Sequence, residues 1–318
     1  MNTLNAIGNI IKNNNCFVLI PHKNPDGDCM GSVVALARAI KAMNKSVKIA
    51  LVGNFVPKRL DYLWDKSFLI NEIPSDYVCI TVDVAATYMI DNLKEDIFDR
   101  AKISCCIDHH GTNAGFADYN YVDATASATG EIIYELVYAE LGIKQDNLID
   151  ECLYSAIASD TGSFQYSNTT AKTHIIASKL VENVDSPKIM RNLFEKKQIE
   201  SLMFMNDIIQ NMEFYYNGRL CLVVIDENML KKHNMVFSDA DEYSSLPRSI
   251  DGVEVGAILK VYAEGEVKVS LRSNEYVDVA TLAKELGGGG HLRASGVTLN
   301  GTTDEVKKTM IQKIGEVL

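Results

Sequence analysis

The chain has 318 residues, of which 47% are hydrophobic and 23% charged, and its formal net charge at pH 7 is −11. This length allows about two domains of ordinary size, and the composition is typical of a globular protein with a sizeable core. The acidic balance excludes a broad surface for duplex nucleic acid, because such a surface needs clustered basic residues to displace counterions from phosphates.

The first half of the chain alternates short apolar runs with segments of helical periodicity. The apolar runs, rich in β-branched residues or cysteine, span residues 16–22, 46–53, 77–83 and 103–110. The helical segments span residues 31–43, 128–142 and 147–160, the second of which ends at Gly142. This alternation predicts βαβ units and therefore an α/β domain with a parallel sheet that carries helices on both faces. We expect this domain over residues 1–185.

The pattern changes at Asp185. Ser186 can cap a helix that has Pro187 at its first position, and residues 188–212 have the periodicity of one long helix. We expect a helical linker over residues 186–213 and a smaller α/β domain over residues 214–318. Its predicted elements are a strand at 219–226, a hairpin at 253–273 turning at Glu264 and Gly265, a helix at 277–286, a glycine loop at 287–291, a strand at 294–299 and a helix from Thr303.

The cysteines and the apolar runs bear on location. The seven cysteines include no CxxC pair, which indicates a reduced protein without a disulfide framework or a zinc site. No apolar run approaches the roughly 18 residues of a membrane span, and the N-terminus lacks the features of a signal peptide. We therefore expect a cytoplasmic protein that has no membrane partner.

Ionisable residues stand where the predicted strands and one helix end: His22, Asp26, Asp28, Asp83, Asp108, His109, His110 and Asp160. The carboxyl ends of parallel strands meet at one edge of a sheet, where open α/β sheets bind their ligands. Each motif alone is typical of a turn or a capped helix end. Their joint occurrence at successive element ends favours a shared site.

Several carboxylates in one crevice repel each other and raise each other's pKa unless cations neutralise them. A mixture of carboxylates and imidazoles suits Mn²⁺, while ligand type alone leaves Mg²⁺, Fe²⁺ and Co²⁺ open. Four aspartates and two histidines suffice for two ions about 3.5 to 4 Å apart that share one carboxylate. Such a pair activates water near neutral pH and stabilises charge on a phosphoryl group, which predicts a two-metal phosphoryl hydrolase.

The second domain carries a candidate anion site. Four glycines, 287–290, precede His291 and Arg293, and a glycine run lets backbone amides approach an anion closely. A flexible linker is the alternative, but the position of the run between a helix and a strand favours phosphate or carboxylate binding. Arg272, at the end of the predicted hairpin, has a planar fork that can clamp a phosphate.

Five motifs together resemble the DHH phosphoesterase family with its appended DHHA1 domain, and most of all its nanoRNase and pAp phosphatase branch and the stand-alone phosphodiesterases that cleave linear pApA. In chain order the motifs are HKNPDGDCMGS, VDVAA, IDHHGTN, SDTGSF and GGGGHLRASG. The resemblance implies an enzyme that cleaves very short oligonucleotides to 5′-mononucleotides, or pAp to AMP and phosphate. It also implies Mn²⁺ as the usual metal, no long duplex as partner, and a homodimer.

The resemblance further implies a role for each matching residue. One metal would be held by His22, Asp26 and Asp83, and a second by Asp28, Asp83, His109 and Asp160. Asp108 would orient a histidine, and His110 would polarise the scissile phosphate or protonate the leaving oxygen. The terminal phosphate of the nucleotide would be bound by Arg272, Ser273, Gly288, Gly289, Gly290, His291 and Arg293.

Three other functions are weighed against this one. A single-stranded DNA exonuclease of the same superfamily would need further strand-binding domains, for which the chain leaves little room. A manganese-dependent inorganic pyrophosphatase shares the metal motifs but has a different second domain, without the GGGGH sequence. A nucleotide-binding sensor without turnover is disfavoured by the complete set of ligands.

Overall fold

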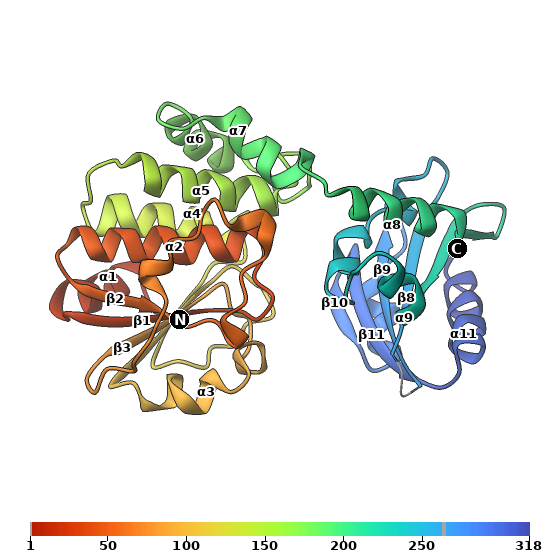
Figure 1. The fold of residues 1–318 in the computed structure, drawn as a ribbon, viewed down its shortest axis with the longest axis horizontal. Coiled ribbons are helices and arrows are strands. Elements are labelled where there is room, and N and C mark those ends of the chain that lie inside the picture. Colours follow the sequence, from red (N-terminus) through yellow and green to blue (C-terminus); the bar gives the residue numbers. More distant parts are fainter. Residues whose placement is uncertain (1, 263–264) are drawn as a thin grey trace. The chain divides into compact units, whose positions relative to one another are not determined.

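The structure, a computed structural model, describes residues 2–262 and 265–318. The chain forms two compact units, residues 1–196 and 197–318, and each is described by itself (Figure 1). The boundary between the units lies inside the segment that was expected to link two domains.

The first unit is built on a parallel sheet of five strands in the order β2-β1-β3-β4-β5. The strands are β1 (Cys16–Pro21), β2 (Ser46–Ile49), β3 (Val78–Val82), β4 (Ile103–Asp108) and β5 (Tyr119–Val122). Four of them match the predicted apolar runs, which confirms the parallel sheet. Strand β5 was not predicted, because its four residues YNYV are only half-buried and form no apolar run.

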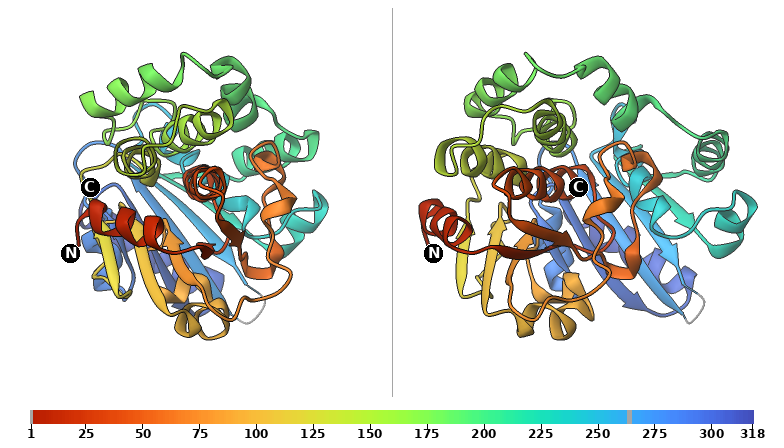
Figure 2. Two further views of the ribbon diagram at one scale, coloured as in Figure 1. Left: turned by 90° about the vertical axis from the view of Figure 1, so that its left-hand side faces the viewer. Right: turned by 60° about the vertical axis from the view of Figure 1, so that its left-hand side comes forward.

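Helices cover both faces of this sheet, as predicted, but unequally. Helices α2 (Gly27–Ala42) and α4 (Thr129–Glu135) pack on one face, and α5 (Asn147–Asp160) lies on them (Figures 1 and 2). The other face is covered by short elements, among them α3 (Leu93–Asp96). Helix α1 (Leu4–Asn13) packs beside β5, and α6 (Ala171–Leu180) packs on α5.

Helix α2 approaches α5 so closely that a side chain is excluded at the contact. A Cβ atom at Gly31 would lie 2.4 Å from the carbonyl oxygen of Cys152, and one at Gly27 would lie 2.4 Å from Oγ of Ser159. The start of α2 therefore lies against the end of α5. This contact brings Asp28, in the first turn of α2, to the same place as Asp160, the last residue of α5.

The prediction of a continuous helix over residues 188–212 is wrong. Helix α7 (Ser186–Met190) continues as a π-helical turn (Arg191–Glu195), and α8 (Ile199–Gln210) starts only after a break at residues 196–198. The two lysines at the break belong to different units: Nζ of Lys196 donates to Asn192 at 2.6 Å, whereas Lys197 pairs with Glu242. Helical periodicity on either side conceals this break in the sequence.

The second unit has a six-stranded sheet in the order β10-β11-β9-β8-β7-β6, in which only β7 and β8 are paired in parallel. The strands are β6 (Glu213–Tyr215), β7 (Leu220–Ile225), β8 (Val255–Val261), β9 (Glu266–Ser273), β10 (Gly289–His291) and β11 (Ala294–Asn300). Helices α10 (Val279–Glu285) and α11 (Thr303–Gly315) contribute to the core on one face, and α8 and α9 (Glu227–Lys232) to the core on the other.

The sequence predicted most of this second unit. The hairpin of β8 and β9 is confirmed; of its expected turn residues, Gly265 has a φ of +74°, and Glu264 lies outside the described residues. The expected glycine loop is wrong in part, because its last three residues form the edge strand β10. In the part of the chain that the structure describes, no helix is long and apolar enough to cross a membrane.

Candidate active site

The parallel sheet of the first unit gathers the predicted metal ligands at the carboxyl ends of its strands. His22 follows β1, Asp83 follows β3, and Asp108 is the last residue of β4, with His109 directly after it. The start of α2 adds Asp26 and Asp28, and the end of α5 adds Asp160. The convergence expected from the topology is therefore present.

Asp83 lies between two imidazoles. Its Oδ2 atom is 3.6 Å from Nε2 of His22, and its Oδ1 atom is 3.8 Å from Nε2 of His109. Nε2 of His22 also lies 4.0 Å from Oδ1 of Asp26, whose carboxylate is half exposed and accepts the Cys29 N–H at the start of α2. This position of Asp83 is the one that a bridging ligand requires.

A second group of donors surrounds His109. Its Nε2 atom lies 3.6 Å from Oδ2 of Asp160 and 3.9 Å from Oδ2 of Asp28. These separations are too long for hydrogen bonds. They are shorter than twice the roughly 2.1 Å that joins a small divalent cation to each ligand, so two such atoms can share one ion.

The orientation of the two imidazoles suits metal binding. Nδ1 of His22 lies 2.8 Å from the carbonyl oxygen of Lys23, and Nδ1 of His109 lies 3.3 Å from that of Ala126. Because a carbonyl only accepts, a hydrogen bond at these contacts places a proton on Nδ1, and in a neutral ring the lone pair of Nε2 then faces the carboxylates. The donor set of oxygen atoms and neutral imidazole nitrogens fits Mn²⁺ or a similar divalent cation.

The N-terminus of α4 fixes two of the carboxylates. Asp28 accepts the backbone N–H groups of Thr129 at 2.7 Å and Gly130 at 2.9 Å, and the hydroxyl of Ser32 at 3.0 Å. The hydroxyl of Thr129 donates to Oδ1 of Asp83 at 2.8 Å. Sequence reasoning missed these donors, which orient ligands and carry no motif of their own. The one available signal was the spacing of Asp28 and Ser32, which stand one helical turn apart and could have indicated their contact.

The carboxylates repel each other in a buried setting. Burial, followed by the charges of Asp83 and Asp160, raises the pKa of Asp28 well above its usual range. Burial and the charge of Asp26 raise the pKa of Asp83, and burial with the charges of Asp26 and Asp83 raises that of Asp160 to about 8. The ionised state of this cluster therefore needs cations, which is a physical argument for a metal centre that does not depend on any motif.

Asp83 also has an unusual backbone. Its φ is +61°, in the left-handed region, where aspartate and asparagine are tolerated better than most residues. Its N–H donates to the carbonyl of Ile107 on the neighbouring strand at 2.9 Å. Backbone strain of this kind clusters at functional sites, where the surrounding structure holds it.

Two buried residues next to the cluster, Asp108 and Asn113, fix the orientation of His110 and affect its pKa. Nδ1 of His110 donates to Oδ1 of Asp108 at 2.7 Å, and Oδ2 of Asp108 accepts from the amide of Asn113 at 2.8 Å. Burial disfavours the charge on His110, but its hydrogen bond to Asp108 and the charge of Asp83 outweigh burial and raise its pKa to about 9. Burial also disfavours the charge on Asp108, yet its bonds to His110 and Asn113 keep its pKa below the usual value.

We therefore expect the ring of His110 in the metal-free protein to titrate with a pKa of about 9, which means that it is charged at neutral pH and loses its proton only above that value. Asp108→Asn should lower this pKa, because the amide carries no charge. The histidine ring resonances followed by NMR against pH measure both. A midpoint near the ordinary value of about 6.5 in the unmodified protein would contradict this environment.

Cys29 is a donor that the sequence analysis did not include. Its Sγ atom and the ligand atoms of His22 and Asp83 lie within 4.8 Å of one another. The thiol accepts the His22 N–H at 3.3 Å and donates to the carbonyl of Val82 at 3.7 Å. Burial, with the charge of Asp83, raises its pKa well above the ordinary value, so it stays a neutral thiol and is a weaker ligand than the carboxylates.

The residues of the predicted anion site in the second unit do not all lie on one face of the sheet, because adjacent residues of a strand point to opposite faces. Arg272 on β9 and His291 on β10 are both paired with Ala294 of β11, from opposite sides, and so share one face of the sheet. Ser270 and Lys268, which the sequence analysis did not select, lie on the same face as Arg272, because alternate residues of a strand point the same way.

Ser273 and Arg293 have other partners. The hydroxyl of Ser273 is buried and donates to the carbonyl of Val277 at 2.7 Å. Arg293 donates to the same carbonyl at 2.8 Å and to that of Glu275. These two side chains therefore hold the segment before α10 and do not lie beside Arg272.

The glycines of this unit permit a close approach of backbone to backbone. A Cβ atom at Gly288 would lie 2.2 Å from the carbonyl of Gly296, and one at Gly290, where φ is +144°, would lie 2.5 Å from that of Ala294. Gly289 lies between them with open space above it. The run is therefore required for the strand pairing and leaves an uncovered stretch of backbone at the sheet edge.

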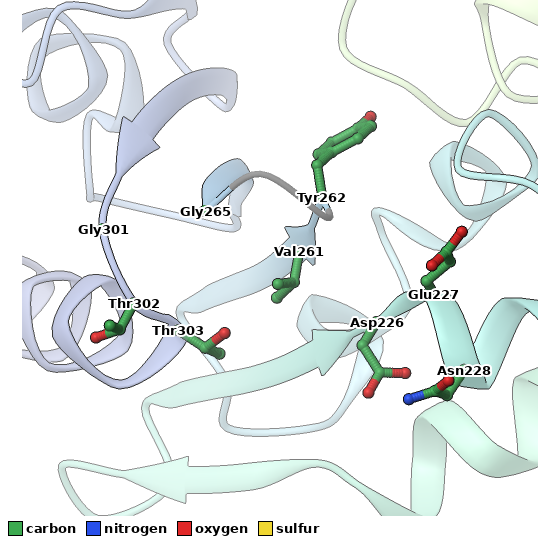
Figure 3. A pocket seen from close by; sticks show the side chains of 9 residues that line it. All are labelled: Asp226, Glu227, Asn228, Val261, Tyr262, Gly265, Gly301, Thr302 and Thr303. Carbon is green, nitrogen blue, oxygen red and sulfur yellow. The ribbon is translucent and has the colours of Figure 1, made fainter.

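A hollow of about 400 Å³ in the second unit contains none of the predicted site residues (Figure 3). Its lining residues are Asp226, Glu227, Asn228, Val261, Tyr262, Gly265, Gly301, Thr302 and Thr303. The carboxylate of Asp226 is occupied as the cap of α9, where it accepts the Met229 N–H at 2.8 Å. The candidate functional sites are therefore the metal cluster and the sheet face that carries Arg272.

Comparison with known proteins shows the family to which this chain belongs. Residues 16–158 match the model of the DHH family, N-terminal domain, and residues 220–318 match that of the DHHA1 domain. The chain is 30% identical over 286 residues to the bifunctional oligoribonuclease and PAP phosphatase NrnA of Bacillus subtilis, and the match covers 89% of each chain.

Two solved structures have a similar fold. The crystal structure of an exopolyphosphatase-related protein from Bacteroides fragilis has a TM-score of 0.88 at 24% identity, covering 98% of this chain and 95% of that chain. The structure of exonuclease RecJ bound to manganese has a TM-score of 0.52 at 10% identity, covering 99% and 94% of the two chains. At these identities the likeness concerns the fold alone.

Proposed function

Because this chain belongs to the DHH family of phosphoesterases, we propose that it hydrolyses very short oligonucleotides, including linear dinucleotides such as pApA, to 5′-mononucleotides, and pAp to AMP and phosphate. The observation that carries the proposal is the convergence of the aspartates and histidines on Asp83 at the carboxyl edge of the sheet. The name of the Bacillus subtilis relative supports the choice of substrates.

The cluster would hold two divalent cations, with Mn²⁺ the first choice. His22, Asp26 and Asp83 would bind one, and Asp28, Asp83, His109 and Asp160 the other. When bound, such cations supply Lewis-acid stabilisation of phosphoryl charge and lower the pKa of water. The manganese named for the RecJ structure is in line with this choice.

The histidine next to the cluster supplies a proton. Nδ1 of His110 is held by Asp108, and in the metal-free fold this hydrogen bond and the charge of Asp83 outweigh burial and raise the pKa of the ring to about 9. The Nε2–H of the charged ring would then be available to the leaving oxygen of the substrate. Asp108 is buried and stays ionised, and it fixes both the orientation and the charge of the ring. We assign general-acid catalysis to His110 and the positioning of His110 to Asp108.

The second unit would bind the terminal phosphate of the substrate. Arg272 and His291 present their side chains from two strands of one face, and Gly288, Gly289 and Gly290 keep the neighbouring edge free of side chains. Ser273 and Arg293 would contribute indirectly, by holding the segment before α10. A cytoplasmic location, expected from the cysteines and the apolar runs, and a homodimeric state, implied by the family resemblance, stay predictions.

Initial rates with Mn²⁺ on pAp, on 5′-phosphorylated RNA oligomers of increasing length and on pyrophosphate test the function. We expect fast cleavage of pAp and of the shortest oligomers, a decline with length, and no turnover after the metal is removed with a chelator. Cleavage of pyrophosphate alone would favour a pyrophosphatase, and cleavage of long single-stranded DNA would favour an exonuclease. Nucleotide binding without turnover would indicate a sensor.

Arg272→Ala is expected to raise KM for substrates that carry a terminal phosphate and to change the hydrolysis of bis(p-nitrophenyl) phosphate little, since that ester has no terminal phosphate. Loss of a charged hydrogen bond of this kind costs about 1.5 to 3 kcal/mol, or roughly 10- to 150-fold. Arg219→Ala, which removes a cation bonded to the carbonyls of Tyr216 and Leu318, is the control. Equal losses on both kinds of substrate would refute this role for Arg272.

A further inference from the structure

The end of α5 is followed by a sharp change of chain direction. Gly162, Ser163 and Phe164 have φ values of +55°, +59° and +66°, three consecutive residues in the left-handed region. The chain then returns toward the end of α5, so that Asn168 contacts Asp160. No role in the site follows from the sequence for Asn168, which stands in the polar stretch YSNTT before α6.

One amide group of Asn168 contacts two segments of the first unit. Its Nδ2 atom donates to the carbonyl oxygen of Ser127 at 2.9 Å and to that of Asp160 at 3.1 Å, and lies 3.4 Å from carboxylate Oδ2 of Asp160. All three neighbours are acceptors, so the amide nitrogen and not the oxygen must face them. Oδ2 of Asp160 is also the oxygen that lies 3.6 Å from Nε2 of His109.

The contact of Asn168 with Ser127 connects it to the segment that binds Asp28 and Asp83. Ser127 stands two residues before Thr129, whose N–H and hydroxyl bind Asp28 and Asp83. The side chain of Ser127 is itself tied to the buried Glu131 by a 2.5 Å hydrogen bond. Asn168 therefore connects Asp160 with the Ser127–Thr129 segment, and this segment orients Asp28 and Asp83.

We propose that Asn168 is a positioning residue of the metal centre, which holds the carboxylate of Asp160 and the Ser127–Thr129 segment at one fixed separation. The inference rests on the proposed function for its catalytic consequence but not for its effect on metal binding. Outer partners of metal ligands typically contribute 10- to 100-fold to affinity or activity when they are intact.

Asn168→Ala is expected to weaken Mn²⁺ binding by about 10- to 100-fold, as measured by calorimetric titration of the full chain without substrate. A higher Mn²⁺ concentration should restore much of the lost rate, because the acid His110 and the substrate face are unchanged. Asn168→Asp keeps the shape of the side chain but replaces the donor with a charged acceptor facing Asp160. It should bind Mn²⁺ no better than the alanine variant.

Asn183→Ala is the matched control. Nδ2 of Asn183 donates to Oδ2 of Asp150 at 3.1 Å in the same unit, so its loss also removes a bond between an amide and a buried carboxylate. We expect a comparable fall in Tm for Asn183→Ala and Asn168→Ala, but unchanged Mn²⁺ affinity for Asn183→Ala. This comparison separates a positioning role from a general effect on stability.

Mn²⁺ affinity equal to that of the unmodified protein in Asn168→Ala would overturn the inference. Restoration of that affinity by Asn168→Asp would also overturn it, because packing and not the hydrogen bonds would then matter. Failure of the proposed function has a different signature: the unmodified protein would bind Mn²⁺ and hydrolyse none of the nucleotides, whatever the affinities of the Asn168 variants.

Discussion

Asp83→Asn is expected to abolish the binding of at least one metal ion and to lower kcat by more than about 100-fold, the upper range for residues that only orient a ligand. Among the residues that the structure describes, Asp83 alone faces both His22 and His109, at 3.6 and 3.8 Å, so its loss affects both groups of donors. Asparagine suits the backbone φ of +61° better than alanine does and can still accept from Thr129. Calorimetric Mn²⁺ titration and initial rates measure the two effects.

Stability separates this loss from misfolding. Because burial and the charge of Asp26 raise the pKa of Asp83, its ionised form is unfavourable in the metal-free fold. Neutral asparagine should therefore leave the metal-free Tm unchanged or raise it. Asp91→Asn is the control: Asp91 also has a positive φ, of +43°, but pairs with Lys23 at 2.8 Å outside the cluster. A normal rate in Asp83→Asn would refute the bridging assignment.

His110→Asn is expected to lower kcat on dinucleotides by about 10²- to 10⁴-fold, the usual contribution of a general acid, with little change in KM. The reason is the leaving group: a nucleoside oxygen needs a proton, whereas p-nitrophenolate does not. The same variant should therefore lose much less activity on bis(p-nitrophenyl) phosphate. Rates on the two substrates under identical Mn²⁺ concentrations give the comparison.

His174→Asn provides the control for this variant. His174 is an exposed histidine of the same unit, stacked on Phe164 at a centroid distance of 5.5 Å, and lies outside the metal cluster. It should keep the full rate on both substrates. Equal losses of His110→Asn on the two substrates would mean that His110 polarises the phosphate and does not protonate the leaving oxygen.

Much of the first unit could be predicted from the sequence, because strands β1, β3 and β4 are buried on both faces and read as apolar runs that end in ionisable residues. His22, Asp83 and Asp108 stand directly at such ends, so the rule that parallel strands share a carboxyl edge was sufficient to bring them together. Asp28 and Asp160 depended on the contact between α2 and α5, which the sequence does not state. Their position at element ends predicted that they share the site, and the resemblance to the family added which ion each would hold.

Other features depended on tertiary contacts that leave no local pattern. Thr129 and Asn168 are ordinary polar residues in the sequence, and only the folded chain shows that they hold Asp28 and Asp160. The resemblance to the family placed Ser273 in the phosphate site together with Arg272, although adjacent residues of a strand point to opposite faces. The break at residues 196–198 was concealed because helical periodicity continues on both sides of it.

The most direct test of the account is a crystal structure of the Mn²⁺-loaded protein, with anomalous difference density measured at the manganese absorption edge. If Asp83 bridges two ions, two peaks are expected in the first unit, one next to His22 and one next to His109, with the carboxylate of Asp83 between them. A single peak that does not touch Asp83, or two peaks that share a different carboxylate, would contradict it.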